Sequence, residues 1–213
     1  MTEDAIKKAM LLYAVTDRAW TQNKTLLEQI EDALDGGATC IQLREKELDD
    51  ATFFDEAVKV KALCQKYKVP FIVNDSVEVA VKAGADGVHV GQGDLPLCEV
   101  RKICGSGMVI GVSAQTAAQA VEAERNGADY LGVGAVFPTS TKKDADAVSL
   151  ETLKEICSSV SIPVVAIGGI SKANMAELKG SGIAGVALVS AIFAAENIKA
   201  ECCVLKKAAM ELL

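Results

Sequence analysis

The sequence is poor in histidine, tryptophan and proline, and each shortage narrows what the chain can do. Its 213 residues contain 1 histidine, 1 tryptophan and 4 prolines, and aromatic residues make up 4% of the total. The single histidine, His89, lies between two valines in an apolar run, so we expect it in the wall of the core. No catalytic triad that needs a histidine elsewhere can form. Trp20 has no aromatic neighbour for stacking on nucleic-acid bases.

The chain also lacks an excess of positive charge and a long hydrophobic run. With 22 basic and 29 acidic side chains it carries a net charge of −7, which argues against nonspecific binding to nucleic acid or anionic membranes. The longest nearly unbroken apolar run, 183–195, is shorter than the roughly 20 residues of a membrane helix. The first residues, MTEDAIKKAMLL, lack the apolar core of a signal peptide. An odd number of cysteines, 7, without framework spacing favours reduced thiols in the cytoplasm.

What the chain does have is a regular alternation of apolar strands and amphipathic helices. The predicted strands are Leu11–Thr16, Thr39–Leu43, Pro70–Asn74, Gly87–Val90, Val109–Val112, Tyr130–Val133, Pro163–Ile167 and Gly185–Val189. Several are almost continuously apolar, as in parallel sheets that are covered on both faces. Eight such units predict a single-domain α/β protein, a (β/α)8 TIM barrel over residues 1–213. A doubly wound open sheet is the alternative, but it rarely needs so many strands in a chain of this length.

Local signals between the strands support helices. An apolar stripe at helical spacing consists of Phe53, Ala57, Val60 and Cys64. Thr25 with Glu28, and Thr116 with Gln119, have the spacing of capping boxes. The segments GGATCIQL, AGADGVHV, NGADYLGV and SGIAGVAL form a weak repeat in which glycine ends a helix just before a strand.

Polar residues follow nearly every predicted strand, at the end where parallel barrels carry their chemistry. Gln42, Arg44 and Lys46 are spaced by two, so their side chains point to the same side of an extended segment. Only the open mouth of a barrel accepts two cations and an amide. The alternative is a solvated loop leaving the strand.

Two aspartates follow neighbouring strands. Asp75 and Asp94 could converge on one hard cation, with the Asn74 amide beside them. Magnesium typically takes one or two carboxylates and fills its other positions with water and phosphate oxygens. The alternative is that both aspartates are helix caps.

Two segments near the end of the chain fit phosphate binding. Gly168-Gly169-Ile170-Ser171 is expected to join a strand to a helix, where free backbone N–H groups favour anions, and Val189-Ser190 repeats this arrangement after the last strand. Earlier in the chain, after the sixth predicted strand, residues 138–143 form a loop of hydroxyls and lysines that could close over a phosphorylated ligand. Plain tight turns and a solvated surface loop are the alternatives. Together with the aspartates and cations, these segments predict a site for Mg²⁺, a diphosphate and a second phosphorylated molecule.

At these residues the sequence resembles the thiamine-phosphate synthase family. The matching motifs, in chain order, are YAVTD at 13–17, QLREK at 42–46, ND at 74–75, GVHVGQGDLP at 87–96, IGVS at 110–113, GVGAVFPTSTK at 132–142, AIGGI at 166–170 and ALVS at 187–190. Most of these motifs are weak individually. In this order, and at strand ends over nearly the whole chain, they are specific.

The resemblance implies a role for each matching residue. The residues expected to bind hydroxymethylpyrimidine diphosphate are Gln42, Leu43, Arg44, Glu45, Lys46, Asn74, Ser113 and Lys142. Those expected to bind thiazole phosphate are Thr139, Ser140, Thr141, Gly169, Val189 and Ser190. It assigns Asp75 and Asp94 to Mg²⁺, and catalysis to Arg44, Lys46, Ser113 and Lys142. The family often has histidine where this chain has Gln115, a departure that affects none of these assignments.

The implied reaction is attack of the thiazole nitrogen on the pyrimidine methylene carbon, with loss of diphosphate, to give thiamine phosphate. A carboxylated thiazole phosphate as acceptor would also lose CO2. The expected partners are therefore these two small molecules, with no nucleic acid and no membrane, and homo-oligomerisation is left open.

Three other interpretations remain. A thiazole tautomerase would need the phosphate loops but no diphosphate–Mg²⁺ half. A non-catalytic sensor of phosphorylated ligands would bind without turnover. A barrel lyase of the tryptophan-synthesis type would need a catalytic Glu–Lys or Asp pair and no metal.

Overall fold

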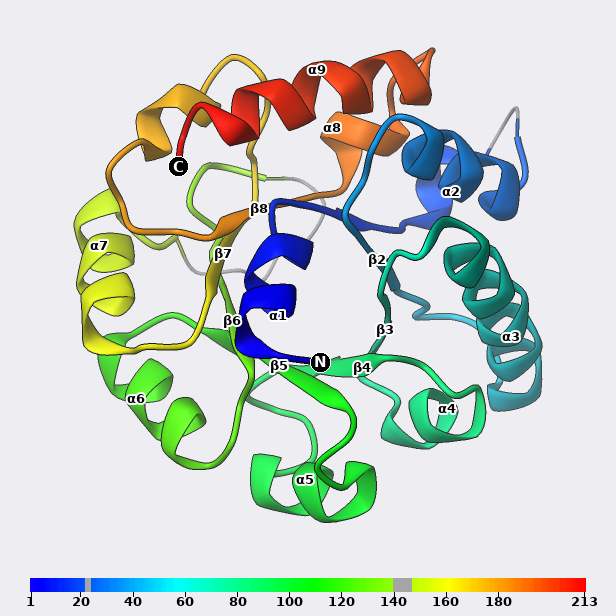
Figure 1. The fold of residues 1–213 in the computed structure, drawn as a ribbon, viewed down its shortest axis with the longest axis horizontal. Coiled ribbons are helices and arrows are strands. Elements are labelled where there is room, and N and C mark those ends of the chain that lie inside the picture. Colours follow the sequence, from blue (N-terminus) through cyan, green and yellow to red (C-terminus); the bar gives the residue numbers. More distant parts are fainter. Residues whose placement is uncertain (22–23, 140–146) are drawn as a thin grey trace.

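The computed structural model describes all residues except 22–23 and 140–146, and its centre is a closed barrel of parallel strands (Figure 1). The strands are β1 (Leu12–Val15), β2 (Cys40–Leu43), β3 (Phe71–Asn74), β4 (Gly87–Val90), β5 (Val109–Ala114), β6 (Tyr130–Val133), β7 (Val164–Ile167) and β8 (Gly185–Leu188). They neighbour one another in chain order, and β8 closes the ring by pairing with β1. The predicted (β/α)8 barrel is confirmed, and each predicted strand agrees with the structure to within two residues at either end.

Helices surround the ring on its outside (Figure 1). They are α2 (Leu26–Asp35), α3 (Asp50–Tyr67), α4 (Val77–Lys82), α5 (Leu97–Cys104), α6 (Ala117–Arg125), α7 (Leu150–Ser159), α8 (Ser190–Phe193) and α9 (Ile198–Met210), with 3-10 turns η1 (Arg18–Trp20) and η2 (Met175–Leu178). A further helix, α1 (Glu3–Ala9), precedes β1. None of the helices in the described ranges is long and apolar enough to cross a membrane.

The local helix signals act largely as predicted. Thr25 and Glu28 form a complete capping box at the start of α2. Thr116 caps α6 by accepting from the Gln119 N–H, but the Gln119 side chain accepts from the Gln115 N–H instead of completing the box. The predicted stripe on α3 is buried along its whole length and comprises Phe53, Ala57, Val60 and Cys64.

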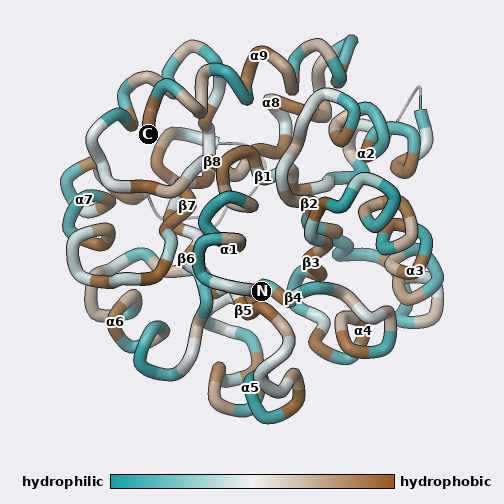
Figure 2. Tube along the Cα trace, in the orientation of Figure 1, coloured by the Kyte–Doolittle hydropathy of each residue, from teal (hydrophilic) through white to brown (hydrophobic). Residues whose placement is uncertain are grey.

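Each strand contributes to two cores, because successive side chains point to opposite faces of the sheet. The outer core lies between strands and helices, and Figure 2 shows brown segments in the strands of the ring and helices in which brown alternates with teal. The inner core fills the barrel and includes Tyr13, Val15, Ile72, Val109, Tyr130 and Val165. This double burial explains why the strand sequences are almost continuously apolar.

The amino-terminal end of the barrel is covered by α1, which lies across the centre of the ring in Figure 1. Ile6, Ala9 and Met10 pack on the inner core. The backbone comes so close that a Cβ on Gly185 would lie 2.0 Å from the Met10 carbonyl oxygen. A ligand must therefore enter from the opposite end, where the strands terminate.

The segment after β7 differs from the prediction. Instead of an α-helix, a turn and then η2 follow the double glycine, and Gly168 and Gly169 have positive φ values of 95° and 66° in this turn. The Asn174 side chain holds the turn by accepting from the Ser171 N–H (2.8 Å) and donating to the Gly169 carbonyl (2.9 Å).

Candidate functional site

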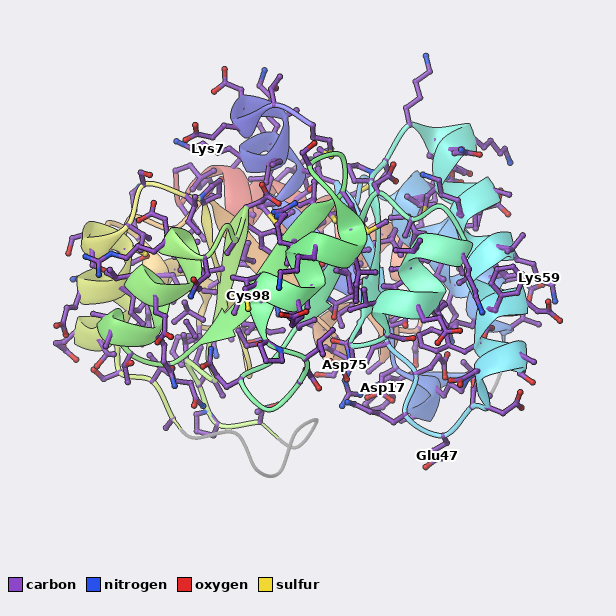
Figure 3. All side chains as sticks on the ribbon, turned by 90° about the horizontal axis from the view of Figure 1, so that it is seen from below. Lys7, Asp17, Glu47, Lys59, Asp75 and Cys98 are labelled. Carbon is purple, nitrogen blue, oxygen red and sulfur yellow. The ribbon has the colours of Figure 1, made fainter. Side chains whose placement is uncertain are left out.

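A cavity of about 460 Å³ opens at the carboxyl ends of the strands, a size typical of small-molecule sites. Figure 3 places Asp75 and Asp17 at this end of the barrel, opposite the end covered by α1 with Lys7. Of the residues predicted to form the site, those that line the cavity are Gln42, Arg44, Lys46, Asn74, Asp75, Asp94, Ser113, Thr139, Gly169, Val189 and Ser190. Ser140, Thr141 and Lys142 lie outside the described residues.

Along residues 42–46, at the end of β2 and just after it, side chains point alternately into the cavity and toward the outer helices. Gln42, Arg44 and Lys46 line the cavity, as their spacing of two predicts. Leu43, of opposite parity, is fully buried in the outer core. Glu45 points to the η1 side, where its Oε2 accepts from the Arg18 Nε at 2.7 Å. Any contribution of Leu43 and Glu45 to ligand binding must therefore come from their backbone groups.

Glu45 is a buried structural carboxylate. Its side chain is 2% exposed, and Arg18 links it to Glu56 on α3 through a second ion pair. Burial raises the pKa of Glu45, and the Arg18 hydrogen bond and charge only partly offset this effect. The pair therefore attaches the loop after β1 to the outer helices.

Neither aspartate at the rim is a helix cap. The cap of α4 is Ser76, whose hydroxyl accepts from the Val79 N–H. The N-cap of α5 is Pro96, which makes no side-chain capping bond. Asp75 instead adopts a positive φ of 62° and pairs with Lys46, Nζ to Oδ2, at 2.5 Å. Both aspartates line the cavity, and the Lys46 cation next to Asp75 lines it too.

The donor set of the cavity fits Mg²⁺ bound together with a substrate. Asp94 Oδ2 accepts from the Gly91 N–H at 2.7 Å, which orients this carboxylate on its loop. Among the described residues, no group of three or more histidine, cysteine, aspartate or glutamate side chains could hold a metal alone. Two carboxylates with free positions for phosphate oxygens and water match the usual magnesium arrangement.

The opposite part of the cavity is built from backbone. A Cβ on Gly169 would lie 2.4 Å from the Pro138 carbonyl oxygen, so only glycine lets the β7 and β6 loops approach so closely. Val189 and Ser190 line the cavity at the start of α8. This wall has little side-chain charge among its described residues, and it can bind an anion through backbone N–H groups and hydroxyls.

The floor of the cavity contains side chains that the sequence analysis did not select. Tyr13 and Tyr130 are fully buried inside the barrel, and both line the cavity together with His89. His89 Nε2 lies 3.0 Å from the Ser113 Oγ. The alternation of side chains along a strand was the signal in the sequence, because it directs both tyrosines to the inside of the barrel.

Comparison with known proteins agrees with these observations. The family model described as thiamine monophosphate synthase matches residues 12–192. The thiamine-phosphate synthase of Ruminiclostridium cellulolyticum is 53% identical over 188 residues, which cover 88% of this chain and 90% of that protein. The thiamine-phosphate synthase of Clostridium tetani is 48% identical over 191 residues, 90% of this chain and 91% of that protein.

A solved structure extends the likeness to three dimensions. The thiamine phosphate pyrophosphorylase from Pyrococcus furiosus superposes with a TM-score of 0.91 at 39% identity, covering 98% of this chain and 99% of that one. Fold, motif order and identity over most of the chain agree, and the chain belongs to the thiamine-phosphate synthase family.

Proposed function

We propose that this protein is a thiamine-phosphate synthase, a transferase of thiamine biosynthesis. It would move the 4-amino-2-methylpyrimidin-5-ylmethyl group from its diphosphate to the nitrogen of a thiazole phosphate and release diphosphate. With a carboxylated thiazole phosphate, CO2 would also be released. The observation that carries this proposal is the convergence of Arg44, Lys46, Asp75 and Asp94 on one cavity whose other wall, among the residues that the structure describes, has no charged side chain.

The charged half of the cavity would bind the pyrimidine diphosphate. Arg44 and Lys46 offer positive charge, and Asn74 and Ser113 offer an amide and a hydroxyl. Gln42 is 5% exposed and lines the cavity, and we expect its side chain to contact the pyrimidine ring. Lys142, from the loop that follows β6, joins this set through the family motif.

Asp75 and Asp94 would hold Mg²⁺, which when bound supplies positive charge next to the diphosphate. Lys46 already pairs with Asp75, so a bound diphosphate would give this lysine a second anionic partner. The carboxylates have no catalytic role of their own in this proposal.

The chemistry requires stabilisation of the departing diphosphate more than activation of a nucleophile. As the bond to the methylene carbon stretches, negative charge accumulates on the diphosphate, and the preorganised Arg44 and Lys46 cations stabilise it. The aminopyrimidine ring delocalises the positive charge left on the carbon. A neutral thiazole nitrogen then attacks, so the reaction needs neither a nucleophilic serine nor a general-base histidine.

The backbone half of the cavity would hold the thiazole phosphate. Thr139, Gly169, Val189 and Ser190 line this wall, and the family motif adds Ser140 and Thr141. Fixing the phosphate here would set the distance between the thiazole nitrogen and the methylene carbon. The proposed partners are these small molecules, and the odd cysteine count favours a reducing compartment, which we propose to be the cytoplasm.

The deciding experiment mixes both phosphorylated substrates with Mg²⁺ and measures diphosphate and thiamine phosphate. We expect equimolar products that depend on both substrates and on the metal. A tautomerase would release no diphosphate, and a sensor would bind ligands without product. Either outcome would overturn the proposal.

A further inference from the structure

A continuous chain of hydrogen bonds crosses the inside of the barrel beneath the cavity. We call it the barrel-floor chain; it comprises Gln42, Tyr13, Tyr130, His89 and Ser113. The Gln42 Nε2 to Tyr13 OH and Tyr13 OH to Tyr130 OH distances are both 2.8 Å. Tyr130 OH to His89 Nδ1, and His89 Nε2 to Ser113 Oγ, are both 3.0 Å. Its members come from β2, β1, β6, β4 and β5.

The barrel is shaped to accommodate this chain. A Cβ on Gly111 would lie 2.1 Å from the Tyr130 ring, and a Cβ on Gly132 would lie 3.0 Å from His89 Cε1. These inward-facing glycines make space for the two rings. The Tyr13 and Tyr130 rings pack edge to face, with centroids 5.9 Å apart. The chain is therefore part of the packed interior.

The amide at one end sets the direction of donation. The Gln42 Nε2 can only donate, so the Tyr13 oxygen accepts, and the one hydroxyl hydrogen of Tyr13 goes to Tyr130. Tyr130 then has one hydrogen left to give, and its remaining partner in the chain is His89 Nδ1. Burial raises the pKa of both tyrosines well above the usual value, so both hydroxyls keep their hydrogens.

The hydrogen bond from Tyr130 also determines which nitrogen of His89 carries a hydrogen. If Nδ1 accepts, the hydrogen of a neutral imidazole is on Nε2, which donates to the Ser113 oxygen. The hydroxyl hydrogen of Ser113 is then directed to another acceptor, and Ser113 lines the cavity. We propose that the barrel-floor chain runs in one direction, holds His89 as the neutral Nε2–H tautomer and makes the Ser113 hydroxyl a hydrogen-bond donor toward the ligand.

The ligand group that accepts from Ser113 would be an oxygen of the pyrimidine diphosphate, and only this detail rests on the proposed function. His89 and Tyr130 are positioning residues, because they act through Ser113. The opposite direction would require the Gln42 amide oxygen to face Tyr13. His89 would then carry its hydrogen on Nδ1, and Ser113 would donate to the ring. The two directions thus differ in the histidine tautomer.

The histidine tautomer can be measured without overlapping signals, because the whole protein contains 1 histidine. We would label histidine with ¹⁵N and record the ring nitrogens of the full-length protein by NMR at pH 8.5, above the usual imidazole pKa of about 6.5. We expect a protonated Nε2 and an unprotonated Nδ1. The reverse pattern would overturn the inference.

Two variants test the cause of the tautomer. Tyr130→Phe removes the donor to Nδ1, and we expect the Nε2–H preference to weaken into a mixture of tautomers. Tyr67→Phe is the matched control, because the Tyr67 hydroxyl bonds to Glu31 and Asp35 on the outer helices. If Tyr130→Phe folds and the His89 tautomer is unchanged, the proposed direction of the barrel-floor chain is contradicted. The wild-type measurement tests the proposal even if this variant fails to fold.

Kinetics test the link to Ser113. The amide nitrogen of His89→Gln reaches about as far as Nε2, whereas that of His89→Asn stops near Nδ1. We expect kcat/KM for the pyrimidine diphosphate to fall about tenfold more in His89→Asn than in His89→Gln, the cost of losing one donor to a charged-ligand network. This difference should disappear when Ser113→Ala is added, because the histidine acts through the serine.

Equal losses in the two His89 variants, or a difference that persists with Ser113→Ala, would overturn the positioning role. An Nε2–H tautomer in a protein that makes no thiamine phosphate would support the proposed direction of the barrel-floor chain and refute the proposed function. An Nδ1–H tautomer in an active enzyme would refute that direction and support the proposed function. The two proposals therefore fail separately.

Discussion

We propose that the two halves of the cavity hold phosphate groups by different means. The half at β2 to β5 presents charged side chains, Arg44, Lys46, Asp75 and Asp94, whereas the half at β7 and β8 presents Gly169 and the start of α8. The difference matches two tasks. A departing diphosphate gains charge during the reaction and benefits from preorganised cations, whereas a phosphate that only anchors its molecule needs a cradle of backbone N–H groups. Substitutions in one half should therefore affect one substrate more than the other.

The largest expected effect comes from the proposed metal-binding position of the charged half. Asp94→Asn keeps an oxygen for the Gly91 N–H but removes the charge. We expect Mg²⁺-dependent turnover to fall at least about a hundredfold, since metal charge stabilisation is worth several kcal/mol. Steady-state rates across a Mg²⁺ titration measure this.

Asp55→Asn, on the exposed face of α3, is the matched control and should retain wild-type turnover. Circular dichroism should show both variants folded. Full activity of the wild-type protein in excess EDTA would refute the assignment of Asp75 and Asp94 to a metal.

Arg44 tests the cationic part of the same half. Arg44→Ala should lower kcat by about ten- to a hundredfold, because a charge-assisted contact to the leaving group is lost. The single-turnover rate should fall more than the affinity for the thiazole phosphate. Arg125→Ala, on the exposed part of α6, should change neither. An equal fall in thiazole affinity would mean that the two halves are not functionally separate.

Gly169 tests the backbone half. Gly169→Ala forces a side chain into a positive φ and against the Pro138 carbonyl, so the loop must move. We expect KM for the thiazole phosphate to rise about tenfold, in line with a local cost of about 1–3 kcal/mol, with a smaller change in KM for the pyrimidine diphosphate. Gly180→Ala has similar backbone strain but open space around it, and it controls for strain alone. A larger change for the pyrimidine substrate would reverse our assignment of the halves.

The smallest expected effect is on stability and concerns Glu45, whose side chain points away from the cavity. Because burial raises the pKa of Glu45, the folded protein holds this proton more tightly than the unfolded chain. The contribution of protonated Glu45 to the unfolding free energy is therefore complete below its ordinary pKa of 4.5. It is lost as the pH rises through the raised pKa of the folded protein. Urea unfolding between pH 4 and 7 should show a shallower decline in unfolding free energy for Glu45→Gln than for wild type. Glu155→Gln, exposed on α7, should follow wild type, and identical slopes for Glu45→Gln would contradict the burial effect.

Sequence reasoning predicted the barrel because its evidence is local. Strand periodicity, the capping box at Thr25 and the apolar stripe of α3 each depend on neighbouring residues. The alternation of side chains that begins in β2 and continues after it likewise placed Arg44 and Lys46 at one cavity. Carrying the QLREK motif over as a block added Leu43 and Glu45, whose side chains the same parity directs elsewhere. The pleat of a strand is thus a sharper guide than motif membership.

Other features could not be predicted, because they depend on contacts between distant residues. Whether Asp75 and Asp94 capped helices or faced the cavity was decided by Ser76 and by the turn at Gly91. The Tyr13–Tyr130 contact joins residues 117 apart in the chain, and it exists only because a glycine on β5 leaves space for a ring from β6.

The amino-acid order alone determined the alternation of elements, the closed barrel and the end of the barrel at which chemistry gathers, since hydrophobic spacing and chain direction act within each unit. Only the assembled barrel decided which inward side chains meet and in which direction their hydrogens point. Closing the ring sets the register of all strands together, and hydrogen-bond partners follow from that register.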